Sequence, residues 1–228
     1  MQEGDRRHTR PIRGNSLAYI LLQNLCQNDW CCNMNLAEKT LRLFGWRVIG
    51  EKPDLKKAVI VMAPHTSYWD AVIGKLVLLS YGVKHKLLSK KELFVWPLSW
   101  VFRLFGMVPI RGLKGKNSVF MVADMLERAD ELFVVICPEG GFAPTDHWST
   151  GFLYMARRAE VPVIVAYVDY KYKTAGMKSV IYDLSDEDAV ISRLAKEYAD
   201  VNAKYPSDFV LPKTGKERQA ARQKGGEA

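Results

Sequence analysis

The sequence predicts an α/β fold: a single layered domain in which helices flank a mixed, mostly parallel sheet. Three observations support this prediction. The chain has 228 residues, of which 48% are hydrophobic, so it can bury one sizeable core. Short apolar runs alternate with stretches of helical periodicity, an order typical of parallel strands joined by helices. The sequence contains no internal repeat and no linker rich in Pro, Gly or Ser, so we expect one domain.

The predicted strands are short apolar runs separated by polar or turn-forming residues. They are Ala58–Met62, His85–Leu88, Met107–Ile110, Leu132–Cys137 and Val163–Tyr167. Because a helical stretch follows each run, we expect successive strands to lie parallel.

The predicted helices lie between and after these strands. They are Asp70–Leu79, Glu92–Leu104, Ser118–Ala129, Thr150–Ala159 and Asp186–Ala203, and Leu36–Trp46 also has helical apolar spacing. The first of the five has a recognisable start, because Ser67 followed three residues later by Asp70 matches the capping-box pattern.

The two ends of the chain differ from its body in composition. We expect a domain over residues 34–212 and a basic, flexible tail over residues 213–228. Residues 1–33 read as a basic extension that is either loosely attached or the result of a start site assigned too far upstream. They weakly resemble a signal peptide, but polar residues interrupt the apolar run and no small-residue cleavage site follows, so we expect an unprocessed chain.

The cysteines argue against a disulfide framework. Cys26, Cys31 and Cys32 precede Met34, and only Cys137 lies in the body of the chain. This distribution favours a reducing compartment. The adjacent cysteine pair is a weak metal signal, since no second pair of ligands follows downstream, and we expect no metal.

Most of the excess positive charge lies in one segment. The formal net charge is +8, and the segment from Lys84 to Lys116 holds eight Lys or Arg residues against one acid, Glu92. Within it lies the apolar and aromatic stretch Leu93–Phe105, flanked by cations. Such a stretch suits an anionic membrane surface, with a core helix that has a solvated basic edge as the alternative. A nucleic-acid surface is disfavoured, because the aromatic residues are packed among Leu and Val instead of spaced along a polar face.

His65 and Asp70 follow the first predicted strand and can form a general base. A carboxylate on the second ring nitrogen fixes the imidazole tautomer and stabilises the imidazolium formed when it takes a proton. Residues five apart do not share a face of a helix or a strand, so the two can meet only if the backbone bends between them. The alternative is that Asp70 only caps the helix and that His65 is an ordinary loop histidine.

Polar groups follow three of the predicted strands. His65 comes after the first, Arg111 after Met107–Ile110, and Pro138–Gly141 after Leu132–Cys137. Ligands of open α/β sheets bind beyond the carboxyl ends of the strands, so these loops are expected to line one cleft. They would supply a base, a cation for an anionic substrate, and a Gly-rich turn whose amides can hold an oxyanion or a phosphate.

Four short blocks in this order resemble those of the glycerolipid acyltransferase family, of the lysophosphatidate acyltransferase type. The blocks are His65–Asp70, Gly106–Arg111, Pro138–Gly140 and Val161–Val163, with flanking likeness at Lys90–Phe94 and Trp148–Phe152. The resemblance covers roughly residues 34–172. It implies a glycerolipid acyltransferase-like α/β fold and the transfer of a fatty acyl group from acyl-ACP or acyl-CoA to a hydroxyl of a lyso-lipid. It also implies an enzyme without a metal or an organic cofactor that works on the cytoplasmic face of the membrane.

The resemblance assigns roles to the catalytic pair. His65 would deprotonate the acceptor hydroxyl and Asp70 would orient His65. The alkoxide would then attack the thioester carbonyl, and the proton would return to the departing thiol.

The remaining expected site residues bind substrate. Arg111 would bind an anionic group of the acceptor, Glu139 would shape the site through hydrogen bonds, and Gly140 and Gly141 would let the backbone approach the substrate. Lys91 is a further candidate for a phosphate contact. The alternatives are solvated surface cations for Arg111 and Lys91, and a capping carboxylate for Glu139.

The third block departs from the family pattern. Where the family has Glu-Gly-Thr-Arg, this chain has Glu139, Gly140, Gly141 and Phe142. The missing guanidinium leaves two possibilities open, a rearranged phosphate site or an acceptor with another head group, such as a lyso form of an amino-acid lipid. A hydrolase using the same base, or a non-catalytic lipid- or nucleic-acid-binding protein, are the competing functions.

Overall fold

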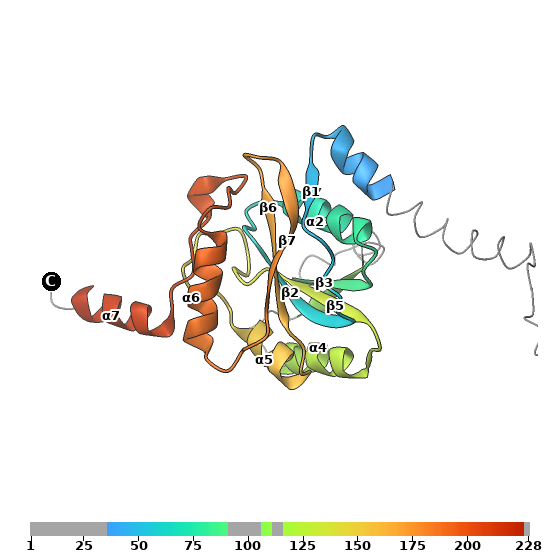
Figure 1. Ribbon diagram of the computed structural model, residues 1–228. Helices are drawn as coiled ribbons and strands as arrows, with labels where there is room; N and C mark the ends of the chain where they lie inside the picture. Colours follow the sequence, from blue (N-terminus) through green and yellow to red (C-terminus); the bar gives the residue numbers. More distant parts are fainter. Residues whose placement is uncertain (1–35, 91–105, 111–115, 226–228) are drawn as a thin grey trace, which may run out of the picture.

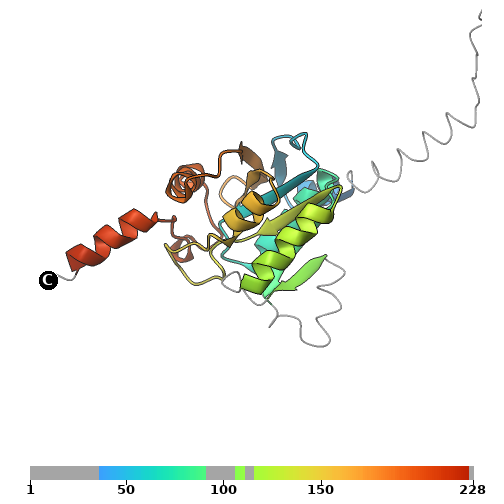
Figure 2. The same ribbon diagram turned by 90° about the horizontal axis from the view of Figure 1, so that it is seen from below.

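The computed structural model describes residues 36–90, 106–110 and 116–225. They form three layers, with one sheet between two layers of helices (Figures 1 and 2). The predicted α/β fold is therefore confirmed.

The sheet has seven strands in the order β1-β7-β6-β2-β5-β3-β4. Their bounds are Arg47–Ile49 for β1, Lys57–Ala63 for β2, His85–Lys90 for β3, Met107–Ile110 for β4, Leu132–Ile136 for β5, Val163–Asp169 for β6 and Thr174–Ile181 for β7. The run from β6 to β4 is parallel, whereas β7 is antiparallel to β6 and parallel to β1. The carboxyl ends of β2, β5 and β6, which are neighbours in the sheet, thus lie at one edge.

The helices divide between the two faces of the sheet. Their bounds are Tyr68–Ser80 for α2, Lys116–Arg128 for α4, Gly151–Arg158 for α5, Glu187–Tyr198 for α6 and Gly215–Gly225 for α7, and η2 is a 3₁₀ turn at Pro206–Asp208. A further helix covers residues 36–43 and is followed by a turn at Gly45, which has a φ of 78°. Helix α2 covers one face, and α4, α5 and α6 cover the other (Figures 1 and 2).

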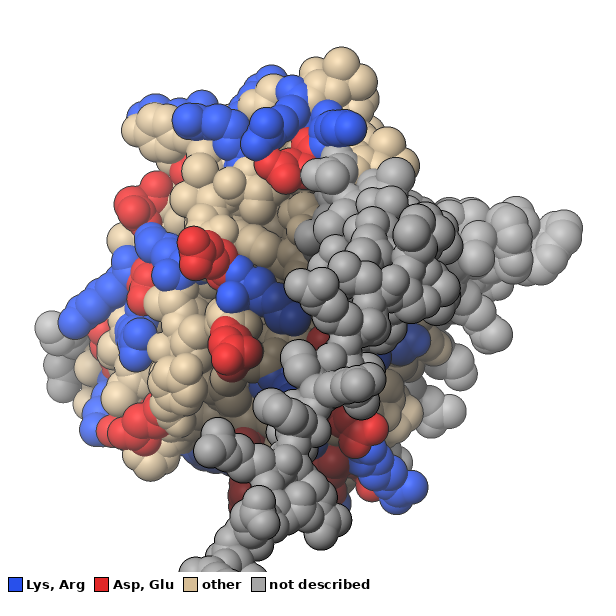
Figure 3. Space-filling model, turned by 45° about the vertical axis from the view of Figure 1, so that its right-hand side comes forward, with Lys and Arg blue, Asp and Glu red and all other residues tan. Residues whose placement is uncertain are grey.

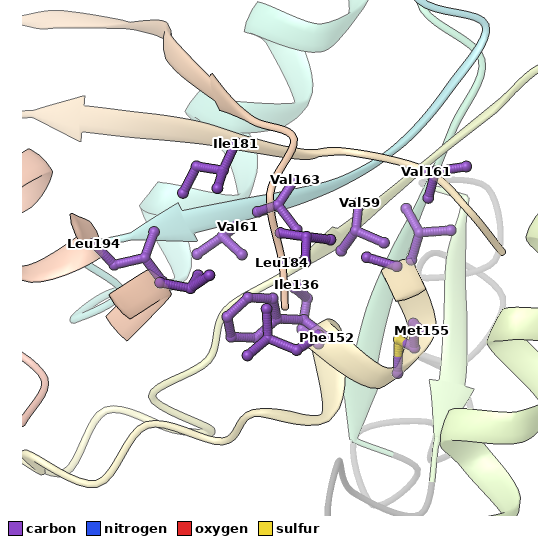
Figure 4. Close-up of a cluster of buried hydrophobic side chains, with 14 of the residues drawn as sticks. Val59, Val61, Ile136, Phe152, Met155, Val161, Val163, Ile181, Leu184 and Leu194 are labelled. Atoms are coloured by element: carbon purple, nitrogen blue, oxygen red, sulfur yellow. The ribbon is translucent and has the colours of Figure 1, made fainter. Parts of the chain in front are cut away.

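Alternate residues of the central strands face opposite layers. Val59 and Val61 of β2 pack with Phe152 of α5 and Leu194 of α6 in one apolar cluster, part of which is drawn in Figure 4. Ile60, which lies between Val59 and Val61, faces α2. A strand buried on both faces is what a parallel sheet requires, and it explains why these runs are continuously apolar.

A glycine brings α2 close to β2. A Cβ on Gly74 would stand 2.6 Å from the Met62 sulfur, so a larger residue would require the flexible Met62 side chain to shift. The start of α2 carries Asp70, and β2 leads directly into His65. The close packing of α2 on β2 thus lies next to the turn that carries both residues.

The observed elements differ from the predicted ones in two strands, at the end of one helix and near the C-terminus. Strands β1 and β7 were not predicted. The helix expected over residues 186–203 ends at Tyr198, and the chain then turns back toward the sheet. Residues 215–225 form α7, which extends away from the layers, where the sequence predicted a flexible tail (Figure 1).

Two further observations bear on the surface. In the part of the chain that the structure describes, no helix is long and apolar enough to cross a membrane. On the face in Figure 3, Lys and Arg side chains gather along the upper edge, whereas both signs of charge are interspersed below. The predicted helix Glu92–Leu104, and with it the basic aromatic stretch, lies outside the described residues.

Candidate active site

The turn between β2 and α2 carries the predicted base. The chain leaves β2 through a cis peptide bond between Ala63 and Pro64 and presents His65 before α2 begins. Ser67 is the N-cap of α2, and the full capping box with Asp70 is present. The backbone therefore bends between His65 and Asp70, as their spacing requires.

Asp70 is fully buried and accepts hydrogen bonds at both oxygens. The amides of Thr66 and Ser67 donate to Oδ2, each at 2.8 Å. The Tyr170 hydroxyl donates to Oδ1 at 2.5 Å. Three donors compensate for the burial of this carboxylate, and they hold it in one orientation.

His65 faces the same carboxylate. Its Nδ1 lies 3.5 Å from Asp70 Oδ2, and this nitrogen has no hydrogen-bond partner within the described part of the chain. The separation exceeds that of a well-formed hydrogen bond, and catalytic hydrogen bonds often shorten only in the complex with substrate. Asp70 thus both caps α2 and faces the imidazole, so the capping and catalytic readings of this residue are compatible.

A hydrogen bond between His65 and Glu139 connects the first and third blocks. Its Oε1 accepts a hydrogen bond of 2.9 Å from the backbone amide of His65, across two neighbouring strands. Its Oε2 is buried without a hydrogen-bond partner among the described residues. The carboxylate therefore fixes the position of the His65 backbone.

Gly140 and Gly141 form the turn after Glu139. Gly140 has a φ of 74°, a left-handed conformation that favours glycine, while a Cβ there would meet nothing within 4 Å. Its amide donates to the Cys137 carbonyl at 3.2 Å and is not free, contrary to the expectation for this turn. The amide of Gly141 donates to no acceptor in the described residues.

Phe142 occupies the position where the third block of the family has arginine. Its ring lies 4.9 Å from the His65 ring and 4.7 Å from the Tyr68 ring, measured between centroids. An apolar ring thus covers one side of the base.

Burial and neighbouring acids act in opposite directions on the pKa of His65. Burial lowers it, but Cys137, Asp70 and Glu139 raise it, and the result is a pKa well above the usual value. Burial also raises the pKa of Glu139 to about 7, although the His65 amide and imidazolium act to lower it. The neighbouring acidic groups thus favour the imidazolium form of His65, and Glu139 changes charge near neutral pH.

Two residues near the base were not predicted. Cys137, the one cysteine in the body of the chain, is a free thiol next to His65. Tyr170 follows β6 and reaches Asp70 from 100 residues away. The only signal for Tyr170 in the sequence is its position just beyond a strand that neighbours β2, at the edge of the sheet where the other polar groups gather.

The placement of two further predicted residues stays a prediction. Arg111 and Lys91 lie outside the described residues. No group of three or more His, Cys, Asp or Glu that could hold a metal ion occurs in residues 36–90, 106–110 and 116–225.

Comparison with known proteins gives a family. The family model described as Acyltransferase matches residues 45–169. No curated protein matches the chain. Among solved structures, the 1-acyl-sn-glycerophosphate (LPA) acyltransferase PlsC from Thermotoga maritima is similar, with a TM-score of 0.51 and 17% identity, over 82% of this chain and 90% of that chain. At this identity the likeness shows a shared fold. Since the family model spans more than half of the sequence, the chain belongs to the acyltransferase family, as its four blocks indicated.

Proposed function

We propose that this acyltransferase moves a fatty acyl group from an acyl thioester to a hydroxyl of a lyso-lipid, with His65 as the general base. The observation that carries the proposal is the contact between His65 and the buried, triply hydrogen-bonded Asp70 at the carboxyl edge of the parallel strands. The family of the chain supplies the reaction class.

The geometry suggests the order of proton transfers. Nδ1 of His65 faces Asp70, so Nε2 is the nitrogen left for the acceptor hydroxyl. Neutral His65 takes the hydroxyl proton as the oxygen attacks the thioester carbonyl. The resulting imidazolium, stabilised by Asp70, returns this proton to the departing thiol.

The Gly141 amide is suited to the oxyanion that forms during attack. It lies on the turn after β5, it donates no hydrogen bond in the described residues, and Glu139 links this turn to His65. A backbone N–H aimed at a developing negative charge stabilises the transition state more than the ground state.

Phe142 supports an acceptor whose head group differs from that of lysophosphatidate. An aromatic ring cannot replace the paired, charge-assisted hydrogen bonds of a guanidinium to a phosphate. A lyso form of an amino-acid lipid is the alternative that we favour, with lysophosphatidate as the second candidate because it is the substrate named for the similar PlsC structure.

The place of action follows from the substrates. Lyso-lipids reside in membranes, and acyl-ACP and acyl-CoA are available on the cytoplasmic side, so we place the enzyme peripherally on the cytoplasmic face. The basic aromatic stretch Leu93–Phe105 is the proposed docking segment.

Product analysis by mass spectrometry tests the proposal. Acyl-ACP and acyl-CoA are each offered with a panel of lyso-lipids, using the parent chain and His65→Ala. We expect an acylated lipid with the parent and a loss of about 10²- to 10⁴-fold with the variant. Thiol release without acylated product would indicate a hydrolase instead, and the absence of both products would indicate a binding protein.

A further inference from the structure

Lys204 lies beside the catalytic turn, on a segment that no sequence motif includes. Its Nζ is 3.5 Å from the hydroxyl oxygen of Ser67, two residues after His65. Ser67 is the N-cap of α2, so the ammonium group of Lys204 adjoins the turn that carries the base.

The segment after α6 is held against the site at two points. The Asn202 backbone and side-chain amides donate to Asp169 Oδ2 at 3.0 and 2.8 Å, next to the end of β6. The Tyr205 amide donates to the Thr66 hydroxyl at 3.3 Å. Lys204 lies between these anchors, so its backbone position is set by the same turn that carries the base.

Two aromatic rings orient the Lys204 side chain. Its Nζ lies 5.7 Å from the centre of the Trp69 ring and 5.5 Å from that of Tyr205. Both rings are well exposed, at 58% and 48%. Aromatic faces attract an ammonium group and order a side chain that is otherwise mobile, but they do not neutralise its charge.

Among the described residues, the charge of Lys204 is not paired with an acid. It forms no ion pair with any carboxylate in the described part of the chain, although other half-exposed lysines, such as Lys178, do so. The result is a positioned, half-buried cation beside the base. The family's arginine is replaced by Phe142, whose ring contacts the His65 ring.

We infer that Lys204 binds the anionic group of the acceptor lipid, a phosphate or a carboxylate, while His65 takes the proton from its hydroxyl. This inference rests on the proposed function. Lys204 would supply the positive charge that the third block lacks. A single ammonium group suits a compact anion better than one that needs the paired hydrogen bonds of a guanidinium.

Acyl-transfer kinetics in neutral detergent micelles test the inference without an anionic surface. The acceptors are lysophosphatidate, a lyso amino-acid lipid with a free carboxylate, and neutral monoacylglycerol. For Lys204→Ala we expect the KM of the preferred anionic acceptor to rise about tenfold or more, with kcat within about threefold and monoacylglycerol unaffected. Whether the phosphate or the carboxylate lipid loses affinity identifies the anion.

Two further variants serve as controls. Lys204→Arg keeps the charge and the ring contacts and should retain most of the affinity. Lys171→Ala removes an exposed lysine whose Nζ lies 5.2 Å from the Tyr172 ring centre, the same kind of contact without a link to Ser67, and should leave every KM unchanged. An equal rise in KM for neutral and anionic acceptors, or no rise at all, would overturn the inference.

A binding experiment separates this inference from the proposed function. Equilibrium dialysis measures the affinity of the parent and of Lys204→Ala for short-chain forms of the same three lipids, below their micelle concentrations. Weaker anion binding by the variant supports the subsite even if the parent shows no turnover. Equal binding by both chains refutes it. Loss of sedimentation with anionic vesicles, with affinity for the free lipids intact, would also refute it and make Lys204 a membrane contact.

Discussion

The Tyr170 hydroxyl donates a 2.5 Å hydrogen bond to Asp70 Oδ1, joining the end of β6 to the first turn of α2. The Tyr170 ring is held in turn by an edge contact with Trp46, with the ring centres 5.1 Å apart. Asp70 is thereby fixed on the side opposite the two backbone amides that bind Oδ2. This relationship makes Tyr170 a positioning residue of the proposed base.

Tyr170→Phe tests that role. The ring contact with Trp46 remains, but a buried carboxylate loses one donor, so we expect a loss of about 1–2 kcal/mol in unfolding free energy. Because Asp70 then interacts more strongly with the imidazolium, the acid limb of the kcat/KM profile should move to higher pH. Tyr172→Phe, at an exposed tyrosine, is the matched control. An unchanged pH profile would leave Tyr170 with a structural role alone.

Asp70→Asn separates capping from catalysis. The side-chain oxygen of asparagine can still accept from the Thr66 and Ser67 amides, so thermal stability should fall modestly, while loss of the negative charge beside His65 should lower kcat substantially. Denaturant unfolding and steady-state kinetics on one preparation measure both effects. His147→Ala, at an exposed histidine, should change neither. A fall in stability without a fall in kcat would favour the cap as the whole role of Asp70.

Cys137→Ala tests the cause of the raised His65 pKa. Cys137 is the largest of the influences that raise this pKa, so its removal should lower the pKa of His65. Burial, which remains in the variant, also acts to lower it. A base with a lower pKa is neutral at lower pH. The acid limb of kcat/KM should therefore move to lower pH, which a pH series of initial rates detects. If the acid limb of kcat/KM does not move, Asp70 and Glu139 account for the raised pKa of His65.

Glu139→Gln tests the buried carboxyl group. Its folded pKa of about 7 lies above the usual value of 4.5, so the folded state holds its proton more tightly than the unfolded state does. The contribution of Glu139 to stability is therefore greatest below pH 4.5 and is lost as pH rises toward 7. Glutamine can still accept from the His65 amide and cannot ionise. The stability of Glu139→Gln relative to the parent should thus improve by about 2 kcal/mol between pH 5 and pH 8. Urea unfolding at the two pH values measures this difference, and an equal effect at both would contradict the raised pKa.

Phe142→Arg tests the acceptor. If the chain acts on lysophosphatidate through a rearranged phosphate site, the variant should use this lipid as well as or better than the parent does. If the natural acceptor has another head group, the variant should use that lipid less well and gain on lysophosphatidate. Direct competition between acceptors, followed by mass spectrometry, distinguishes the two. A strong preference of the parent for lysophosphatidate would contradict the acceptor that we favour.

The elements nearest the site were the most predictable part of the fold. β2 and β5 are buried on both faces and therefore continuously apolar, and the Ser67–Asp70 capping box marked the start of α2 to within two residues. Strands β1 and β7 were missed because they lie at one edge of the sheet, where burial is incomplete and the apolar pattern is weaker. The end of α6 was missed because helical residues continue past Tyr198, while the contacts of Asn202 with Asp169 turn the chain back.

The sequence by itself determined the reaction class and the candidate base, because catalysis depends on a few residue types in a short, ordered pattern that survives when most other positions change. Tertiary structure alone decided what surrounds that base. Cys137 and Tyr170 follow β5 and β6, Lys204 lies in the segment between α6 and η2, and no local spacing relates these residues to His65. The parallel sheet brings the ends of β2, β5 and β6 to one edge, and burial there, through the desolvation of charged groups and their mutual interactions, sets the pKa values on which the proposed chemistry depends.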